Sequence, residues 1–164
     1  STPLALIPQT NQATKKKNYL HHHTKNNSKA MTSKVIYKGG LEIECIHLKS
    51  NDSIRTDAPI DNNGKGAAFS PTDLCATSLA TCMLTVMGIW ARDNEVDMDG
   101  AYADVTKHMG SDPRRITKID VNLFMPDHEY TSKVKSILTH IAQTCPVAKS
   151  LHPDLIQNIV LNWK

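Results

Sequence analysis

The sequence predicts one α+β domain that occupies residues 31–164. Three observations predict this class: short runs in which apolar and polar residues alternate, a long apolar segment that begins with a helix cap, and an amphipathic helix between later strands. A chain of 164 residues normally forms a single domain with a continuous hydrophobic core.

The first part of the domain has the pattern of antiparallel strands. Residues 34–38 and 41–48 alternate as half-buried strands do, and the two adjacent glycines between them favour a hairpin turn. A third strand is predicted over residues 53–57. The glycine-containing segment 61–66 lacks the spacing of a phosphate-binding loop, so we interpret it as an ordinary connection.

A strong helix start follows at Ser70. Ser70 can cap the helix, Pro71 suits the first helical position, and the carboxylate of Asp73 can reach back to the cap. The helix is predicted to run to about Arg92, and its apolar residues spread around most of its circumference. A helix of this kind belongs in the centre of the molecule.

The second half of the domain returns to strands before it ends in helices and a last strand. Strands are predicted over 100–108 and 117–125, with a turn between them. Apolar residues at helical spacing predict a helix over 131–143. A short third helix is predicted to begin at Cys145, and a final strand covers 156–163.

Composition indicates an ordinary globular protein. Hydrophobic residues make up 40% of the chain and charged residues 21%. The most apolar stretch, residues 74–91, is interrupted by serine and threonine and is better explained as a buried helix than as a membrane span. We therefore expect a cytoplasmic protein with no membrane partner.

The net charge of +3 depends on residues 1–30, which contain five lysines and no acidic residue. The remainder has 14 basic and 16 acidic residues, so nucleic acid is not an expected partner. Because residues 1–30 also lack a hydrophobic period, we interpret them as a leader, a tag remnant or a flexible extension. Their three consecutive histidines leave a metal-binding tail or a basic interaction arm as the alternative.

The four cysteines do not have the pattern of a disulfide framework or a zinc site. No signal peptide is recognisable, and no C-x-x-C pair or close Cys/His cluster occurs, so no metal or other cofactor is expected. Cys45 alternates with apolar strand residues and is predicted to lie in the core. Cys75 and Cys82 share one helix face but lie about 10 Å apart along the axis, too far for a mutual disulfide.

Cys145 has a different setting, because it precedes Pro146 at a predicted helix start. Unpaired backbone N–H groups and the helix dipole at such a position favour a thiolate and lower the pKa of the thiol. A simple capping role is the alternative. Among the cysteines, Cys145 has the most direct local indication of reactivity.

Two motifs resemble those of the OsmC/Ohr family. The run FSPTDLCATSLATCML, which starts at Phe69, is similar to the family's helix that begins (S/N)-P and carries a cysteine twelve residues later. The run CPVAKSL at Cys145 resembles the family's C-P-V-(S/A) element, and the segments TDAP and GKG upstream also fit a branch of OsmC-like proteins. The resemblance covers residues 31–164.

This resemblance implies an OsmC-like fold in an intertwined homodimer, in which antiparallel sheets wrap around two long central helices. It also implies that Cys82 is the peroxidatic thiol and that Cys145 is the resolving thiol. The expected activity is reduction of organic or lipid hydroperoxides, followed by reset of the pair by a dithiol reductant. Thiolate attack on a peroxide leaves a sulfenic acid, which a second thiol condenses into a disulfide.

The sequence departs from the family in the residues that activate the first thiol. The best-characterised members use an arginine from the N-terminal hairpin, which is held by a glutamate at the place of Thr72. Here the acid is Asp73, nine residues before Cys82 and so about 180° around the helix, which favours a capping role. The hairpin itself carries acids where the cation is expected, so Arg55 of the third strand is the first candidate for the missing cation, with Lys38 and His47 as weaker ones.

Two other functions remain open from the sequence. One is a redox-sensing or ligand-binding OsmC-like protein with low turnover. The other is a Cys-dependent thioesterase or hydrolase, which needs a histidine within hydrogen-bond reach of a reactive thiol. Four histidines of the domain show no telling spacing for that role: His47, His108, His140 and His152.

Overall fold

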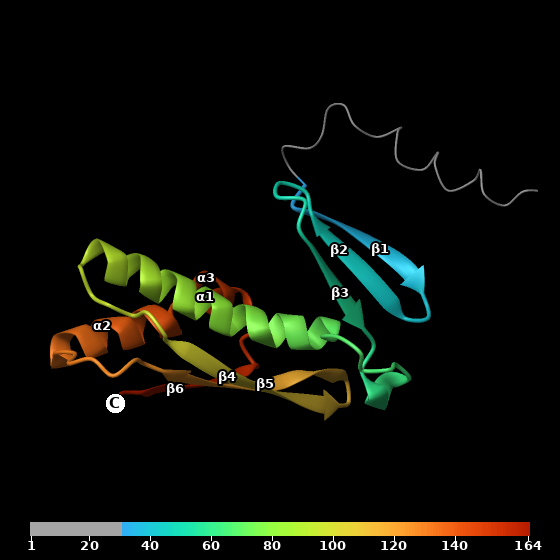
Figure 1. The fold of residues 1–164 in the computed structure, drawn as a ribbon. Helices are drawn as coiled ribbons and strands as arrows, with labels where there is room; N and C mark the ends of the chain where they lie inside the picture. The colour runs from blue at the N-terminus through green and yellow to red at the C-terminus, as the bar shows by residue number, and fades with distance from the viewer. Residues whose placement is uncertain (1–30) are drawn as a thin grey trace, which may run out of the picture.

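A computed structural model describes residues 31–164, and the interpretation of residues 1–30 lies outside that range. Within it the chain forms two three-stranded sheets and three α-helices, as Figure 1 shows. The elements are β1 (Ser33–Gly39), β2 (Glu42–His47), β3 (Ser53–Asp57), α1 (Pro71–Asp93), β4 (Tyr102–Ser111), β5 (Arg114–Phe124), α2 (Ser132–Gln143), α3 (Pro146–Ser150) and β6 (Ile156–Asn162). The predicted α+β class is confirmed.

The first three strands form an antiparallel sheet in the order β1-β2-β3, which we name sheet A. The hairpin between β1 and β2 turns at Gly39 and Gly40, whose φ angles of 96° and 60° explain why glycine is used there. A short 3-10 turn, η2 (Ile60–Asn62), lies in the connection from sheet A to α1. The predicted hairpin is therefore present.

The remaining strands form sheet B, in the order β4-β5-β6. β4 and β5 are antiparallel, but β6 runs parallel to β5. The family resemblance implied antiparallel sheets, and the parallel pairing of β5 with β6 differs from that expectation. Its physical reason is the connection: α2 and α3 intervene between β5 and β6, and a parallel pair needs a long crossover of this kind.

The core lies between α1 and sheet B. Leu79, Met83 and Met87 on α1 are fully buried, as are Ile119 and Val121 on β5. β5 contributes alternate residues to this layer, which matches the period of two that a strand with one covered face requires. α1 and α2 lie over the same face of sheet B, so α1 occupies the expected central place in this layer (Figure 1).

α1 is also long and apolar enough, by length and composition, to cross a membrane. Its buried side packs on sheet B, which is the arrangement of a core helix. Its opposite side carries an exposed stripe of Thr81, Thr85 and Ile89. No charged residue occurs between Asp73 and Arg92, so this exposed stripe is uncharged.

Sheet A stands apart from the layer of α1 and sheet B in Figure 1. Its strand register places Val35, Cys45 and Ile54 side by side on one face, with Tyr37 and Ile43 in the next row. We name these five residues the apolar face of sheet A. Val35 and Tyr37 are each 63% exposed and Ile54 is 54% exposed. The prediction that Cys45 is a core residue is therefore wrong within the described chain, because its side chain is only partly buried and lies outside the core cluster.

Candidate active site

The fold brings Cys82 and Cys145 together. Cys82 lies in the middle of α1, is partly exposed, and packs against the core cluster to which Cys145 belongs. Cys145 is the N-cap of α3 and is 2% exposed. Cys82 lies close enough to Cys145 to influence its thiol, and the backbone N–H of Ala148 donates to Cys145 Sγ at 3.4 Å. The two thiols therefore form one site.

The expected low pKa of Cys145 is contradicted. Burial raises the pKa of the Cys145 thiol above its ordinary value, and contact with Cys82 raises it further. The N–H groups of Ala148 and Val147 act in the opposite direction, as the helix start led us to expect, but they do not outweigh burial. The helix terminus therefore lowers the pKa of Cys145 as expected, but the cost of ionising a buried thiol is larger.

Asp73 is a helix cap, as predicted. Its carboxylate accepts the backbone N–H of Ser70 at 2.8 Å, and Ser70 Oγ accepts the backbone N–H of Asp73 at 3.1 Å. Burial opposes ionisation of Asp73, but the hydrogen bonds from Lys107 and Ser70 outweigh it and lower the pKa of this carboxyl group. Nine residues of helix, about 13 Å along its axis, separate Asp73 from Cys82.

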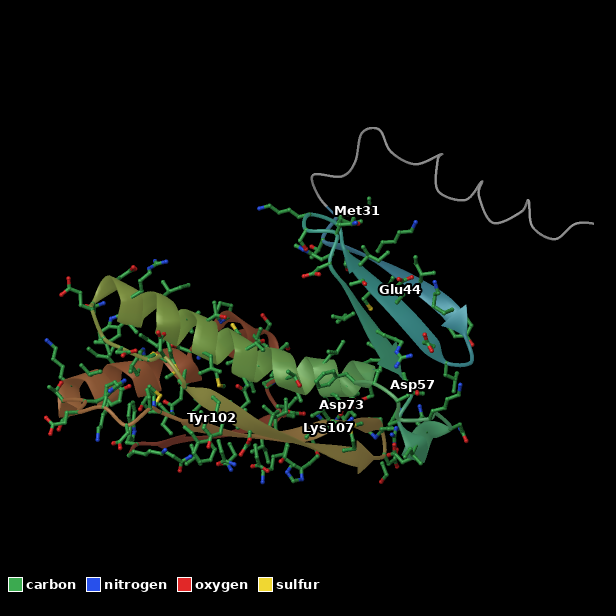
Figure 2. The ribbon with its side chains drawn as sticks, viewed as in Figure 1. Met31, Glu44, Asp57, Asp73, Tyr102 and Lys107 are labelled. Carbon is green, nitrogen blue, oxygen red and sulfur yellow. The ribbon has the colours of Figure 1, made fainter. Side chains whose placement is uncertain are left out.

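Lys107 is a residue that the sequence analysis missed. Its ammonium lies 2.6 Å from Asp73 Oδ1 and donates to Thr72 Oγ1 at 2.7 Å and to Ser70 Oγ at 3.0 Å. Figure 2 labels Lys107 on β4 and Asp73 at the start of α1. One sequence signal was available: strand alternation places Lys107 on the same inward face as Val105, where a lysine needs a polar partner.

An open pocket of about 390 Å³ lies beside this cluster, where Phe69, Thr77 and Val105 are among the lining residues. The α1 residues that line the pocket are Asp73, Ala76 and Thr77, and helical geometry places them on the side of α1 opposite to Cys82. It is therefore separate from the thiol site of the same chain.

Arg55 is engaged away from the thiols. Its guanidinium lies 3.6 Å from Glu42 Oε2 and donates to the carbonyl of Ala67 at 3.4 Å. These contacts tie the arginine to its own sheet and to the connection that leads to α1. Neither contact joins it to Cys82.

The same connection is anchored by Asp57, which is labelled in Figure 2. The Asp57 carboxylate is 4% exposed and accepts the N–H of Ala67 at 3.0 Å. That hydrogen bond lowers the pKa of Asp57 and keeps the carboxylate ionised although it is buried. Asp57 thus fixes the backbone shortly before the helix start.

None of the histidines considered for a hydrolase is in contact with a thiol. His47 bonds to Ser50 in a sheet A turn, and His108 pairs with Asp120 on the outer face of sheet B. His152 pairs with Asp154, and His140 is exposed near the end of α2. Among residues 31–164, no group of three or more His, Cys, Asp or Glu side chains is placed to hold a metal ion.

A family model described as OsmC-like protein matches residues 64–157, which include both thiols and all of α1. The chain belongs to the OsmC-like family. No curated protein sequence matches it.

Solved structures agree with this assignment. A protein of Psychrobacter arcticus 273-4, for which a role in the osmotic stress and detoxification response has been put forward, is 53% identical, with a TM-score of 0.78. The match covers 80% of this chain and 96% of the Psychrobacter chain. An organic hydroperoxide resistance protein OsmC of Legionella pneumophila is 12% identical, with a TM-score of 0.64 over 81% of this chain and 98% of its own.

An organic hydroperoxide resistance protein of Elizabethkingia anophelis is also similar. It is 12% identical, with a TM-score of 0.63 over 82% of this chain and 97% of its own. At such identities the likeness shows the fold alone. Family membership itself rests on the family model and on the Psychrobacter match.

Proposed function

We propose that this OsmC-like protein is a thiol-dependent peroxidase that reduces organic or lipid hydroperoxides through Cys82 and Cys145. The observation that carries the proposal is the contact between a partly exposed thiol on α1 and a buried thiol at the start of α3. Because Cys82 is the more accessible of the two, it is the thiol that meets the peroxide. The apolar core residues around the pair favour a hydroperoxide with an organic group.

The proposed chemistry needs only these two thiols and an external reductant. The Cys82 thiolate attacks the terminal oxygen of the hydroperoxide, the O–O bond breaks, and the alkoxide takes a proton and leaves as an alcohol. Cys82 is then a sulfenic acid. Cys145 attacks the Cys82 sulfur, and the Cys145 proton leaves with the hydroxyl group as water. A dithiol donor reduces the resulting disulfide and returns both thiols.

We further infer that the working unit is a homodimer. Most of sheet A is uncovered within the described chain: the apolar face is open except at its Thr56 end, and Ile36 and Arg55 mark the opposite, partly charged face. A three-stranded sheet gains little stability unless a hydrophobic face is buried. The exposed uncharged stripe of α1 provides a second surface without a partner. A second copy of the chain that covers both surfaces accounts for them together.

The test is oxidation of the reduced protein with cumene hydroperoxide. We expect an intramolecular Cys82–Cys145 disulfide, identified by mass spectrometry of the linked peptides, and dithiol-dependent consumption of the peroxide. Cys82→Ser should abolish peroxide consumption. The matched variant Cys75→Ser, which changes a cysteine seven residues earlier on the same face of α1, should retain it. Full peroxide consumption by Cys82→Ser would rule out the proposal.

A redox sensor with slow turnover is the second candidate. It is favoured by the raised pKa of Cys145, which slows any step that needs a Cys145 thiolate, and by the engagement of Arg55 elsewhere. A sensor forms the same disulfide but shows negligible turnover with every dithiol donor. Steady-state consumption measured with several donors separates the two functions. The hydrolase receives no support, because the four histidines considered for it have other partners or are exposed.

A further inference from the structure

The direction of sheet A depends on a single connection. Among the described residues, the strands of sheet A make no extensive contact with α1 or with sheet B. The chain passes from β3 to α1 through residues 58–70, in which η2 is the only regular element. Connecting segments are generally more mobile than the elements that they join. The hydrogen bonds of this connection therefore determine whether sheet A is held or swings.

The two ends of the connection are bonded to each other. The backbone N–H of Asp57 donates to the carbonyl of Phe69 at 3.1 Å, and the N–H of Gly66 donates to the carbonyl of Ala58 at 3.2 Å. The chain thus leaves β3, closes a loop and returns beside its starting point before α1 begins. We name residues 57–69 the clip.

Side chains of β3 bind the returning arm of the clip at Ala67. Asp57 Oδ2 accepts the N–H of Ala67 at 3.0 Å, and the guanidinium of Arg55 donates to the carbonyl of the same residue at 3.4 Å. The Asp57 carboxylate is buried, and Figure 2 labels it where sheet A meets the connection. Its other oxygen, Oδ1, has no hydrogen-bond partner among the described residues, so the bond to Ala67 is the anchor that this side chain supplies.

The arms of the clip approach so closely that glycine is required. A Cβ atom at Gly64 would overlap the carbonyl oxygen of Ala58. Gly66 has a φ angle of 63°, which glycine adopts without strain. Beyond the clip, Ser70 is buried, caps α1 and accepts a hydrogen bond from Lys107. The clip is therefore closed within itself and continues into a fixed helix start.

We propose that the clip holds sheet A in one direction relative to α1 and so presents the apolar face of sheet A, already oriented, to a second copy of the chain. Asp57 is its positioning residue, because it ties the returning arm to β3. A surface that is ordered before association does not lose that conformational freedom on binding. The role in assembly rests on the proposed homodimer, whereas the hold on sheet A does not.

The first test follows the direction of sheet A by NMR in the isotope-labelled full-length Val35→Asp protein, whose charged apolar face a second copy should not cover. Residual dipolar couplings report the alignment of sheet A and of the layer of α1 and sheet B. We expect one alignment tensor for both, and order parameters of about 0.85 for the amides of Gly66 and Ala67. Asp57→Ala should reduce the couplings of sheet A alone and lower these order parameters below about 0.6.

A second variant opens the clip by a different route. Gly64→Ala forces the arms apart and leaves Asp57 in place, so it should have the same effect on sheet A. Asp52→Ala is the matched control, because Asp52 is exposed just before β3 and its carboxylate makes no hydrogen bond or ion pair within residues 31–164. The control should keep a single tensor. A general structural defect would also lower the order of β5, which the loss of the clip should leave unchanged.

The second test measures assembly by analytical ultracentrifugation of the full-length chain with Val35 intact. Asp57→Ala and Gly64→Ala should each weaken the dimer by about tenfold, and Asp52→Ala should not. A swinging sheet A with unchanged dimer affinity would overturn the role of the clip in assembly. A wild-type chain that stays monomeric would instead refute the homodimer, and the alignment result alone would then decide whether the clip holds sheet A.

A single alignment tensor in both Asp57→Ala and Gly64→Ala would overturn the clip itself. A single tensor in Asp57→Ala alone would overturn the role of Asp57. Circular dichroism identifies a variant that fails to fold, and the other variant then decides.

Discussion

At the scale of single residues, Lys107 shows how one inward-facing cation can hold a helix start. Its ammonium has three partners at the first turn of α1: Ser70, Thr72 and Asp73. Removal of the ammonium leaves the partly buried Asp73 carboxylate with only its capping hydrogen bond. An ionic group that loses a hydrogen-bonded partner in such a place becomes costly.

We therefore predict that Lys107→Met lowers the free energy of unfolding by about 1–2 kcal/mol, which urea titration at pH 7 would measure. Lys133→Met is the matched control, because Lys133 is exposed on α2 and makes no ion pair among the described residues. The control should change stability by less than about 0.5 kcal/mol. Equal losses in the two variants would contradict the role assigned to Lys107.

At the scale of elements, Asp120 connects the three strands of sheet B. It lies on the central strand β5, where its carboxylate contacts His108 of β4 at 2.5 Å, Lys118 of β5 at 2.9 Å and Asn158 of β6 at 2.7 Å. The hydrogen bonds from Lys118, Asn158 and His108 lower the pKa of Asp120 to about 2. The ionised carboxylate therefore stabilises the folded sheet.

The sign of the pH dependence follows from that shift. A carboxyl group whose pKa is lower in the folded state stabilises it fully above the unfolded pKa, and loses that contribution as pH falls through the folded pKa. We predict that Asp120→Asn is less stable than wild type at pH 7 and that the difference shrinks between about pH 4 and pH 2. Urea midpoints measured at several pH values test this. The control Asp104→Asn, exposed on the same face of sheet B, should show no such convergence.

At the scale of the whole molecule, the open surfaces lead to a prediction about assembly. Val35 belongs to the apolar face of sheet A, on the edge strand β1, and is 63% exposed in the single chain. If a second copy covers this face, Val35→Asp places an unpaired charge in the interface and should shift the protein toward monomer. Analytical ultracentrifugation of wild type and variant measures the change.

Ile156→Asp is the matched control for assembly. Ile156 is 61% exposed on the outer face of sheet B, in the row of His108 and Lys118, where polar neighbours favour solvent. This variant should sediment as wild type does. A wild-type chain that remains monomeric at micromolar concentration would contradict the proposed homodimer.

Much of the fold was predictable because its signals are local. The Ser70 cap, the Asp73 capping box and the Gly39-Gly40 hairpin each depend on residues close together in the chain, and all three are present. Strand positions followed from alternation in the same way. The parallel pairing of β6 was not predictable, because alternation determines which face a residue occupies but not the direction of the neighbouring strand.

The features of the candidate site also separate into those that depend on local sequence and those that depend on long-range packing. Neighbouring residues alone place Cys82 on a long apolar helix and Cys145 at the start of a short one, so both positions were predictable. Three features became visible with the packing of distant segments: the two thiols lie close together, burial raises the pKa of Cys145, and Lys107 binds Asp73. The physical reason is that desolvation and ion pairing depend on what packs around a group, and those neighbours come from distant parts of the chain.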